Sequence, residues 1–197
     1  MKACFAEGRK VCLRPVEAAD SPTIFRWKSD PFIRRMAGDP AVPVQLEDER
    51  QDIERSAGAC EQLYLMVVLR ETEQPIGYVR VNWMDAGRRS AWLRFALGEH
   101  RGHGYASDAI QCLLARLFRE GTHRVDAEAY EFNHASLRLL ERLGFRREGV
   151  RREAHFDGQR YADVVAFGLL EADFRHPERG QCLPRADQSS GPTALSP

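Results

Sequence analysis

The chain has 197 residues, 43% of them hydrophobic and 29% charged, a composition typical of a globular protein that needs no disulfide scaffold. Its 29 Lys and Arg residues balance 29 Asp and Glu residues, which argues against a protein that binds nucleic acid by neutralising many phosphates. No run of about 18 apolar residues is present and the N-terminus lacks a signal-like apolar stretch, so we expect neither a membrane partner nor export.

The cysteines are odd in number and scattered, and no Cys-x-x-Cys pair occurs among them. They are Cys4, Cys12, Cys60, Cys112 and Cys182. This spacing indicates neither a zinc site nor a disulfide framework. We therefore expect a reduced, cytoplasmic protein.

The first quarter of the chain predicts one short strand and two helices. Residues 10–14 alternate and stop at a proline, which predicts a strand. Asp20-Ser21-Pro22 is typical of a helix start. Residues 30–44 contain three prolines and should be mostly irregular, with one short helical turn. Residues 45–57 predict a polar surface helix. Its many acidic side chains face solvent or, as the alternative, attract a cationic ligand by their field.

The middle of the chain predicts an antiparallel meander followed by a crossover. Short turns join the predicted strands 62–70, 76–85 and 90–98, as neighbouring antiparallel strands require. Apolar residues then recur at helical spacing over 106–118. Residues 123–130 predict the strand that follows this helix.

The last third predicts a helix and a hairpin. The helix covers residues 133–143, with an asparagine N-cap and a glycine just past its end. Strands 145–156 and 160–170 are joined by Asp157-Gly158, which is typical of a tight hairpin turn.

The order of these elements predicts a mixed α/β (α+β) domain. Its central sheet should be mostly antiparallel, with about seven strands, flanking helices and one strand–loop–helix crossover. We assign residues 1–175 to this domain. Residues 176–197 lose all periodicity and are rich in Pro, Ser, Gly and charge, so they predict a disordered tail.

The crossover loop has the chemistry of an anion site. A strand ending at Phe95-Ala96-Leu97 runs into Gly102-His103-Gly104 and then into a helix. Glycines let successive main-chain N–H groups converge, and the free N–H groups of the helix start point the same way. Diphosphate is the natural ligand of such an anion site. The alternative is a tight loop that binds no ligand, which could have the same sequence.

Two common phosphate motifs are excluded. A Walker loop needs Gly-Lys-Ser/Thr, which is absent here. The dinucleotide fingerprint Gly-x-Gly-x-x-Gly would place its third glycine at Ser107, and it belongs to a parallel sheet rather than a meander.

Residues 10–172 resemble the GNAT superfamily of acyl-CoA-dependent N-acetyltransferases. They are most similar to its RimJ/RimL branch of ribosomal-protein N-terminal acetyltransferases and to spermidine acetyltransferases. The matching segments are VCLRPVEAADSPTIFRWKSD, RGHGYASDA, NHASLRLLERLGFRREG and FDGQRYADVVAFGLL. Each segment is weak alone, whereas their order and spacing together are specific. The resemblance implies the GNAT fold.

The resemblance also implies acetyl-CoA as the acyl donor. No metal is expected, because His100 and His103 have no third ligand near them in the sequence. The main chain of Arg101, Gly102, His103, Gly104, Tyr105 and Ala106, together with Ser107, should hold the CoA diphosphate. Phe95, Ala96 and Leu97 should bond the pantetheine like an added strand, while the strand at 123–130 diverges and opens a cleft. Asn133 and Ser136 should reach the pantetheine and the thioester.

Several positions depart from the family pattern. Glu99 stands where the motif has Gln or Arg, and Leu140 stands where many members have a tyrosine that protonates the leaving thiolate. Some members of this branch are thought to use the serine that matches Ser136. A glutamate proposed as base in this branch falls at His155, and Glu153 lies two residues earlier, on the same face of a regular strand.

Our sequence hypothesis is an N-acetyltransferase that acts on a primary amine by direct attack in a ternary complex. A protein α-amine has a pKa of about 7.8 and is partly neutral at physiological pH, so a modest base suffices. His155 and Glu153 are the candidate bases, and Ser136 is the candidate partner of the thiolate. The alternatives are a small-molecule amine acetyltransferase (polyamine, amino sugar or antibiotic) and a non-catalytic acyl-CoA sensor. An open strand edge at the C-terminal hairpin is compatible with a homodimer.

Overall fold

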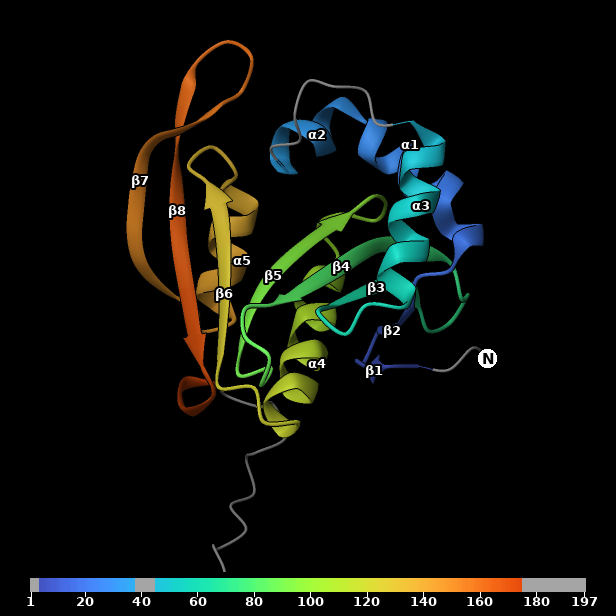
Figure 1. The fold of residues 1–197 in the computed structure, drawn as a ribbon. Coiled ribbons are helices and arrows are strands. Elements are labelled where there is room, and N and C mark those ends of the chain that lie inside the picture. The colour runs from blue at the N-terminus through green and yellow to red at the C-terminus, as the bar shows by residue number, and fades with distance from the viewer. Residues whose placement is uncertain (1–3, 38–44, 175–197) are drawn as a thin grey trace, which may run out of the picture.

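The computed structural model describes residues 4–37 and 45–174, which form one eight-stranded sheet with helices on both faces (Figure 1). The strands are β1 Ala6–Glu7, β2 Val11–Pro15, β3 Gln62–Leu69, β4 Pro75–Trp83, β5 Ser90–Leu97, β6 Arg124–Tyr130, β7 Arg146–Phe156 and β8 Tyr161–Leu170. Their order in the sheet is β1-β2-β3-β4-β5-β6-β8-β7. Only β5 and β6 pair in parallel among these strands. The predicted fold class is confirmed, with the short β1 as an additional strand.

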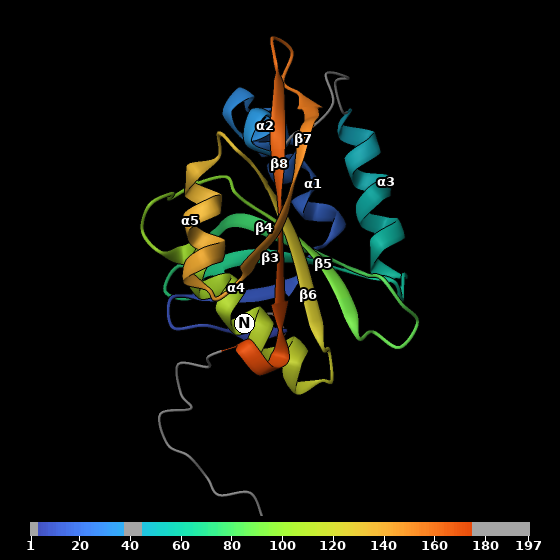
Figure 2. The same cartoon turned by 90° about the vertical axis from the view of Figure 1, so that its left-hand side faces the viewer.

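Five α-helices within residues 4–37 and 45–174 cover the sheet. They are α1 Ser21–Ser29, α2 Pro31–Ala37, α3 Leu46–Ala57, α4 Tyr105–Arg119 and α5 His134–Arg142. Figure 2 shows α5 and α3 on opposite sides of the sheet. The side chains of α4 and α5 pack into the core on one face, and those of α1, α2 and α3 pack into a smaller core on the other. Alternation along β3 divides these cores, because Leu65 and Val67 face the first whereas Tyr64 and Met66 face the second.

The segment predicted to be mostly irregular contains α2, a seven-residue helix. Asp30 caps it by accepting a hydrogen bond from the Ile33 N–H at 3.0 Å, and Pro31 occupies the first helical position, where its missing N–H is harmless. Proline therefore starts a helix here rather than preventing one. Residues 38–44 and the predicted tail at 176–197 lie outside the described residues, so the tail stays a prediction.

The expectation that all cysteines are reduced is wrong for one pair. Cys4 and Cys12 form a disulfide across the β1–β2 hairpin, where the register Glu7–Cys12 brings the strands together. Cys60 and Cys112 are free thiols. The two bonded cysteines are only eight residues apart, but nothing in their spacing reveals that an antiparallel hairpin lies between them.

Replacing Cys12 with serine should lower the free energy of unfolding of the oxidised protein by about 2 kcal/mol, because the cross-link restricts the unfolded chain. Urea denaturation with and without reductant measures this. The Cys60→Ser variant should match the wild type under both conditions. A wild-type midpoint that does not respond to reductant would contradict the prediction.

No helix within the described ranges has the length and apolar character needed to cross a membrane. In the same ranges, no three or more His, Cys, Asp or Glu side chains lie together as a metal site.

Candidate active site

The loop between β5 and α4 presents a row of main-chain N–H groups. His100, Gly102 and Gly104 have left-handed φ angles of 53°, 86° and 82°, which turn the chain sharply before α4 begins. The N–H groups of Gly104, Tyr105, Ala106 and Ser107 have no hydrogen-bond partner in the described part of the chain. Converging free N–H groups at a helix start form an anion seat.

The sheet opens directly beside this loop. β5 pairs with β6 only from Ser90 to Leu93, whereas its pairing with β4 continues to Leu97 (Figure 1). β6 turns away with β8, to which it pairs as far as Tyr130. The main chain of residues 94–97 therefore has no strand partner on its β6 side. It has the polar groups to bond an extended ligand like an added strand.

The back of the loop is anchored to α1. Glu99 accepts hydrogen bonds from Arg26 at 2.7 Å, from Gln74 at 2.9 Å and from the Trp27 indole at 3.3 Å. Gly98 lies so close that a Cβ there would come within 2.2 Å of the Trp27 ring. The departure from the family motif at Glu99 thus has a structural reason, since this carboxylate holds the loop on the helix.

The side chains of Arg101 and His103 interact with the loop itself. The Arg101 guanidinium donates to the carbonyls of Leu97 and Gly98 at 3.0 and 3.3 Å and stacks over Phe32. The His103 Nδ1 lies 3.0 Å from the Arg101 carbonyl. Both side chains thus bond to main-chain carbonyls of residues 97–101, whereas the N–H groups of Gly104–Ser107 stay free among the described residues.

Helix α5 begins where β6 ends. The Asn133 side chain caps it by accepting a hydrogen bond from the Ser136 N–H at 3.1 Å, and donates to the Met36 carbonyl of α2 at 3.2 Å. The Ser136 hydroxyl is half-buried and has no hydrogen-bond partner among the described residues. Leu140 is completely buried in the core, so it belongs to the packing of α5 rather than to the chemistry.

His155, on β7, lies beside the end of β6. Its ring packs 4.2 Å from the ring of Tyr130 at the end of β6, with Phe132 alongside. Helix α2 reaches the same corner, because Arg35 stacks over Phe132 and lies 3.7 Å from Asp157 in the hairpin turn. The structure therefore brings His155 and the start of α5 to the end of the same strand.

Glu153 lies in a β-bulge. The register shifts between Arg151 and His155, and Glu153 has a left-handed φ of 50° while its N–H donates to the Asp163 side chain at 2.8 Å. The expectation that Glu153 and His155 share a strand face assumed unbroken alternation, and the bulge interrupts it.

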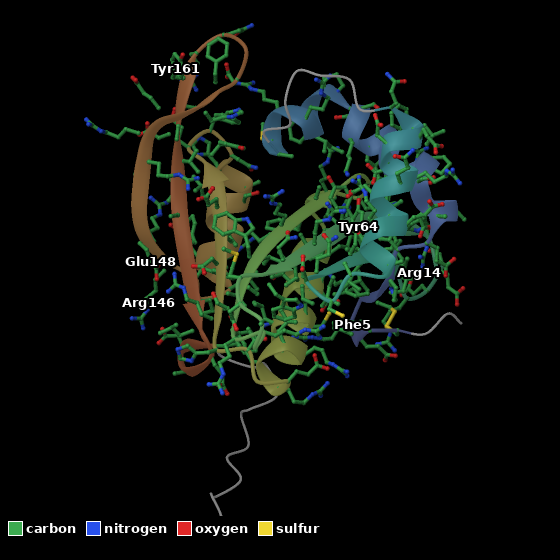
Figure 3. All side chains as sticks on the ribbon, in the orientation of Figure 1. Phe5, Arg14, Tyr64, Arg146, Glu148 and Tyr161 are labelled. Carbon is green, nitrogen blue, oxygen red and sulfur yellow. A yellow bond between two sulfur atoms is a disulfide. The ribbon has the colours of Figure 1, made fainter. Side chains whose placement is uncertain are left out.

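Glu49 corrects the interpretation of residues 45–57 as a wholly solvated acidic face. Its side chain is 1% exposed and forms an ion pair with Lys28 of α1 at 2.7 Å. It also accepts a hydrogen bond from Tyr64, which lies between β3 and α3 (Figure 3). Burial, together with the charge of Glu49, raises the pKa of Tyr64. The sequence carries no signal for this contact, because its partners are distant in the chain.

Cys112 is not a candidate nucleophile. It lies on α4, half-buried against the core, and burial raises the pKa of its thiol to about 12. A thiol with so high a pKa remains protonated at neutral pH.

Comparison with known proteins bears on the family of the chain. A family model described as "Acetyltransferase (GNAT) domain" matches residues 10–146. The chain is 29% identical over 169 residues to an uncharacterized N-acetyltransferase, p20, of Bacillus licheniformis, an alignment that covers 84% of this chain and 95% of that protein.

Two solved structures show the same fold. Spermidine N-acetyltransferase from Vibrio cholerae, in complex with CoA and spermine, has a TM-score of 0.77 at 22% identity and covers 83% of this chain and 97% of its own. RimL, a ribosomal-protein α-N-acetyltransferase in complex with CoA, has a TM-score of 0.76 at 18% identity and covers 85% and 98%.

Proposed function

The chain belongs to the GNAT acetyltransferase family, and we propose that it transfers an acetyl group from acetyl-CoA to a primary amine by direct attack in a ternary complex. The observation that carries this proposal is the row of free N–H groups at Gly104–Ser107 beside the unpaired edge of β5. The two features together match a ligand that has a diphosphate at one end and an extended amide arm at the other.

The loop fits the diphosphate of CoA. The main chain from Arg101 to Ala106, with Ser107, would hold the phosphates. Gly102 has no side chain, and the space where its Cβ would lie has no protein atom within 4 Å, so the phosphates can approach the main chain there. Phe95, Ala96 and Leu97 would bond the pantetheine amides. Asn133 and Ser136 would lie near the thioester, where the free Ser136 hydroxyl has a proton to donate to the leaving sulfur.

The acceptor amine has to lose a proton, and His155 is the base we propose for it. An imidazole accepts a proton near neutral pH and is well matched to an α-amine, whose neutral form is already well populated. Glu153 is the second candidate, on the same hairpin. For the attack, the amine must lie against the carbonyl carbon of the acetyl thioester, where β5 and β6 diverge.

We propose the α-amine of a peptide as the acceptor, rather than a polyamine. The acidic side chains of β6, on the sheet face that carries α1–α3, are already neutralised. Asp126 pairs with Arg124, and Glu128 pairs with Arg151. A polycation needs uncompensated negative charge to draw it in. Unpaired carboxylates near the acceptor would favour a polyamine. Asp126 and Glu128 are not such carboxylates, because each has a cationic partner.

An amine panel tests the function. Purified protein with acetyl-CoA should release free thiol only when an amine is added, and peptides with a free N-terminus should react faster than N-blocked peptides, spermidine or an amino sugar. Faster reaction with a small amine would move the assignment to that alternative. Binding of acetyl-CoA without thiol release for any amine would favour the non-catalytic sensor.

Replacing His155 with alanine should lower kcat/KM about tenfold near neutral pH, a modest effect for a general base because part of the α-amine is already neutral. The slope of the pH–rate profile below neutrality should also change. His134→Ala, on the exposed first turn of α5, is the matched control and should leave the profile unaltered. If the profile of His155→Ala keeps its wild-type slope, Glu153→Gln becomes the next variant to measure.

We also propose that the enzyme acts in the cytoplasm. β7 is the last strand of the sheet, and we propose that its outer edge can pair with a second copy in a homodimer.

A further inference from the structure

Arg94 is the first residue of β5 beyond the point where the sheet splits. The parallel pairing of β5 with β6 ends at Leu93 and Ala127, and Arg94 follows directly (Figure 1). Leu93 and Phe95 pack into the core that holds α4 and α5, whereas Ala96 packs against the core of α1, α2 and α3. Alternation along the strand therefore places Arg94 on the α1–α3 face, where it is exposed.

The charges of β6 on this face are already paired. Asp126 binds Arg124, and Glu128 binds Arg151 of β7. Arg94 forms no hydrogen bond or ion pair with any residue that the structure describes. The two carboxylates closest to it across the split are thus engaged by other arginines, and the guanidinium of Arg94 is left without a counter-charge.

Arg94 also lies opposite a like charge. Its direct partner in the antiparallel pair of β4 and β5 is Arg80. Like charges that face each other across two strands destabilise a sheet. Arg80 is neutralised by Asp52 of α3 and stacks over Tyr64, with its guanidinium carbon 4.0 Å from the ring centroid. A carboxylate bound to Arg94 would neutralise the second cation of this pair.

The proposed function brings the reacting amine to the same place. A pantetheine bonded along residues 97 to 95 leads away from the loop between β5 and α4, so its thioester ends beside residue 94, where β6 has diverged. The acceptor amine must reach the thioester there. The long side chain of Arg94 can then meet a group that the acceptor carries a few bonds from its amine.

We propose that Arg94 binds a carboxylate that the acceptor carries close to its reacting amine, so that the enzyme prefers peptides with Asp or Glu as the second residue. This inference rests on the proposed function and adds a substrate class to it. A guanidinium donates two parallel hydrogen bonds to a carboxylate, which fixes its orientation as well as its charge. The same positive charge repels a polyamine, in agreement with a peptide acceptor.

Steady-state kinetics with matched peptides test the inference. The peptides begin with Ser-Glu, Ser-Gln or Ser-Lys and are otherwise identical. At saturating acetyl-CoA the wild type should have a kcat/KM about tenfold higher for the glutamate peptide than for the glutamine peptide, as expected for one partly screened charge-assisted pair. The lysine peptide should be the slowest, and the ratio should fall as the salt concentration rises.

A free amino acid offers the same chemistry through its α-carboxylate, and free serine measured against serinamide distinguishes this source. With the carboxylate on the second side chain, the two should react alike. A faster reaction of free serine that is lost in Arg94→Ala would support the same pairing and assign the carboxylate to a free amino acid.

Arg94→Ala should bring the ratio of the glutamate to the glutamine peptide close to one, with the larger loss on the glutamate peptide. Arg94→Glu should reverse the order and favour the lysine peptide, a result that a merely structural role would not produce. Arg94→Lys should keep part of the wild-type ratio. Arg89→Ala is the matched control, since Arg89 is exposed just before β5 and its printed hydrogen bonds involve only its main chain.

A wild type that acetylates the glutamate and glutamine peptides equally, and free serine no faster than serinamide, would overturn the inference and leave the proposed function standing. An Arg94→Ala variant that keeps the full wild-type ratio would also overturn it. If no amine is acetylated, the proposed function fails together with the inference. Circular dichroism shows whether each variant is folded, and because the measure is a ratio within one protein, a partial loss of folded material cancels.

Discussion

Replacing Gly104 with valine is expected to weaken acetyl-CoA binding about 100-fold, because hydrogen bonds from N–H groups to charged phosphate contribute on the order of 1.5–3 kcal/mol each. Gly104 has a φ of 82°, a conformation that a β-branched residue avoids. A valine would turn this peptide away and misdirect the N–H groups that begin α4. Steric overlap is not the cause, since the nearest atom to an added Cβ is the Lys10 ammonium at 3.8 Å. Isothermal titration with acetyl-CoA measures the change.

Gly121→Val is the matched control for this variant. Gly121 follows the opposite end of the same helix, has a similar φ of 98°, and has no neighbour within 4 Å of an added Cβ. The two variants should lose similar free energies of unfolding, about 1–3 kcal/mol, from the same backbone strain. Only Gly104→Val should lose affinity. Equal affinity in the two variants would show that the loop N–H groups do not hold the nucleotide.

Replacing Glu49 with alanine should destabilise the protein by about 3–5 kcal/mol, because it leaves the Lys28 ammonium buried without its counter-charge. The Lys28 and Glu49 side chains are 17% and 1% exposed and join α1 to α3. Tyr64 also loses the acceptor for its hydroxyl. Urea denaturation followed by circular dichroism gives the free energy of unfolding.

The double variant Lys28→Met/Glu49→Leu should recover much of this loss, because two apolar side chains of similar volume leave no unpaired charge. Glu54→Ala, on the same helix, should change stability by less than about 0.5 kcal/mol, since Glu54 is half-exposed and pairs with an exposed Arg50. A double variant as unstable as Glu49→Ala would mean that packing, rather than charge, explains the loss.

The Lys28–Glu49 pair also matters for the site, although it is not part of the chemistry. It fixes α1, and α1 supplies the Arg26 and Trp27 contacts to Glu99 that hold the loop between β5 and α4. Glu49→Ala should therefore weaken acetyl-CoA binding as well, by less than the Gly104→Val variant does. The loss of affinity would arise because α1 is held less firmly and its contacts with Glu99 weaken.

Local chemistry in the sequence determined most of the elements and the position of the glycine-containing loop between β5 and α4. Hydrophobic periodicity located the meander and α4, and turn residues located the hairpin at Asp157-Gly158, where Gly158 has a φ of 96°. The loop can be recognised from the sequence because Gly102 and Gly104 allow left-handed backbone angles. This property does not depend on contacts with residues far away in the chain. Helix caps such as Asn133 are local for the same reason.

Contacts between distant residues were decided only by the tertiary structure. The hydrogen bonds that the Asp108 carboxylate accepts from the main chain of residues 9–11 span 97 to 99 residues, and the Lys28–Glu49 pair spans 21. The Cys4–Cys12 bond and the bulge at Glu153 depend on strand register, which is set by packing across the whole sheet. A charged residue has the same sequence signature whether it is solvated or buried against a partner, because its partner is chosen by the fold and not by its neighbours in the chain.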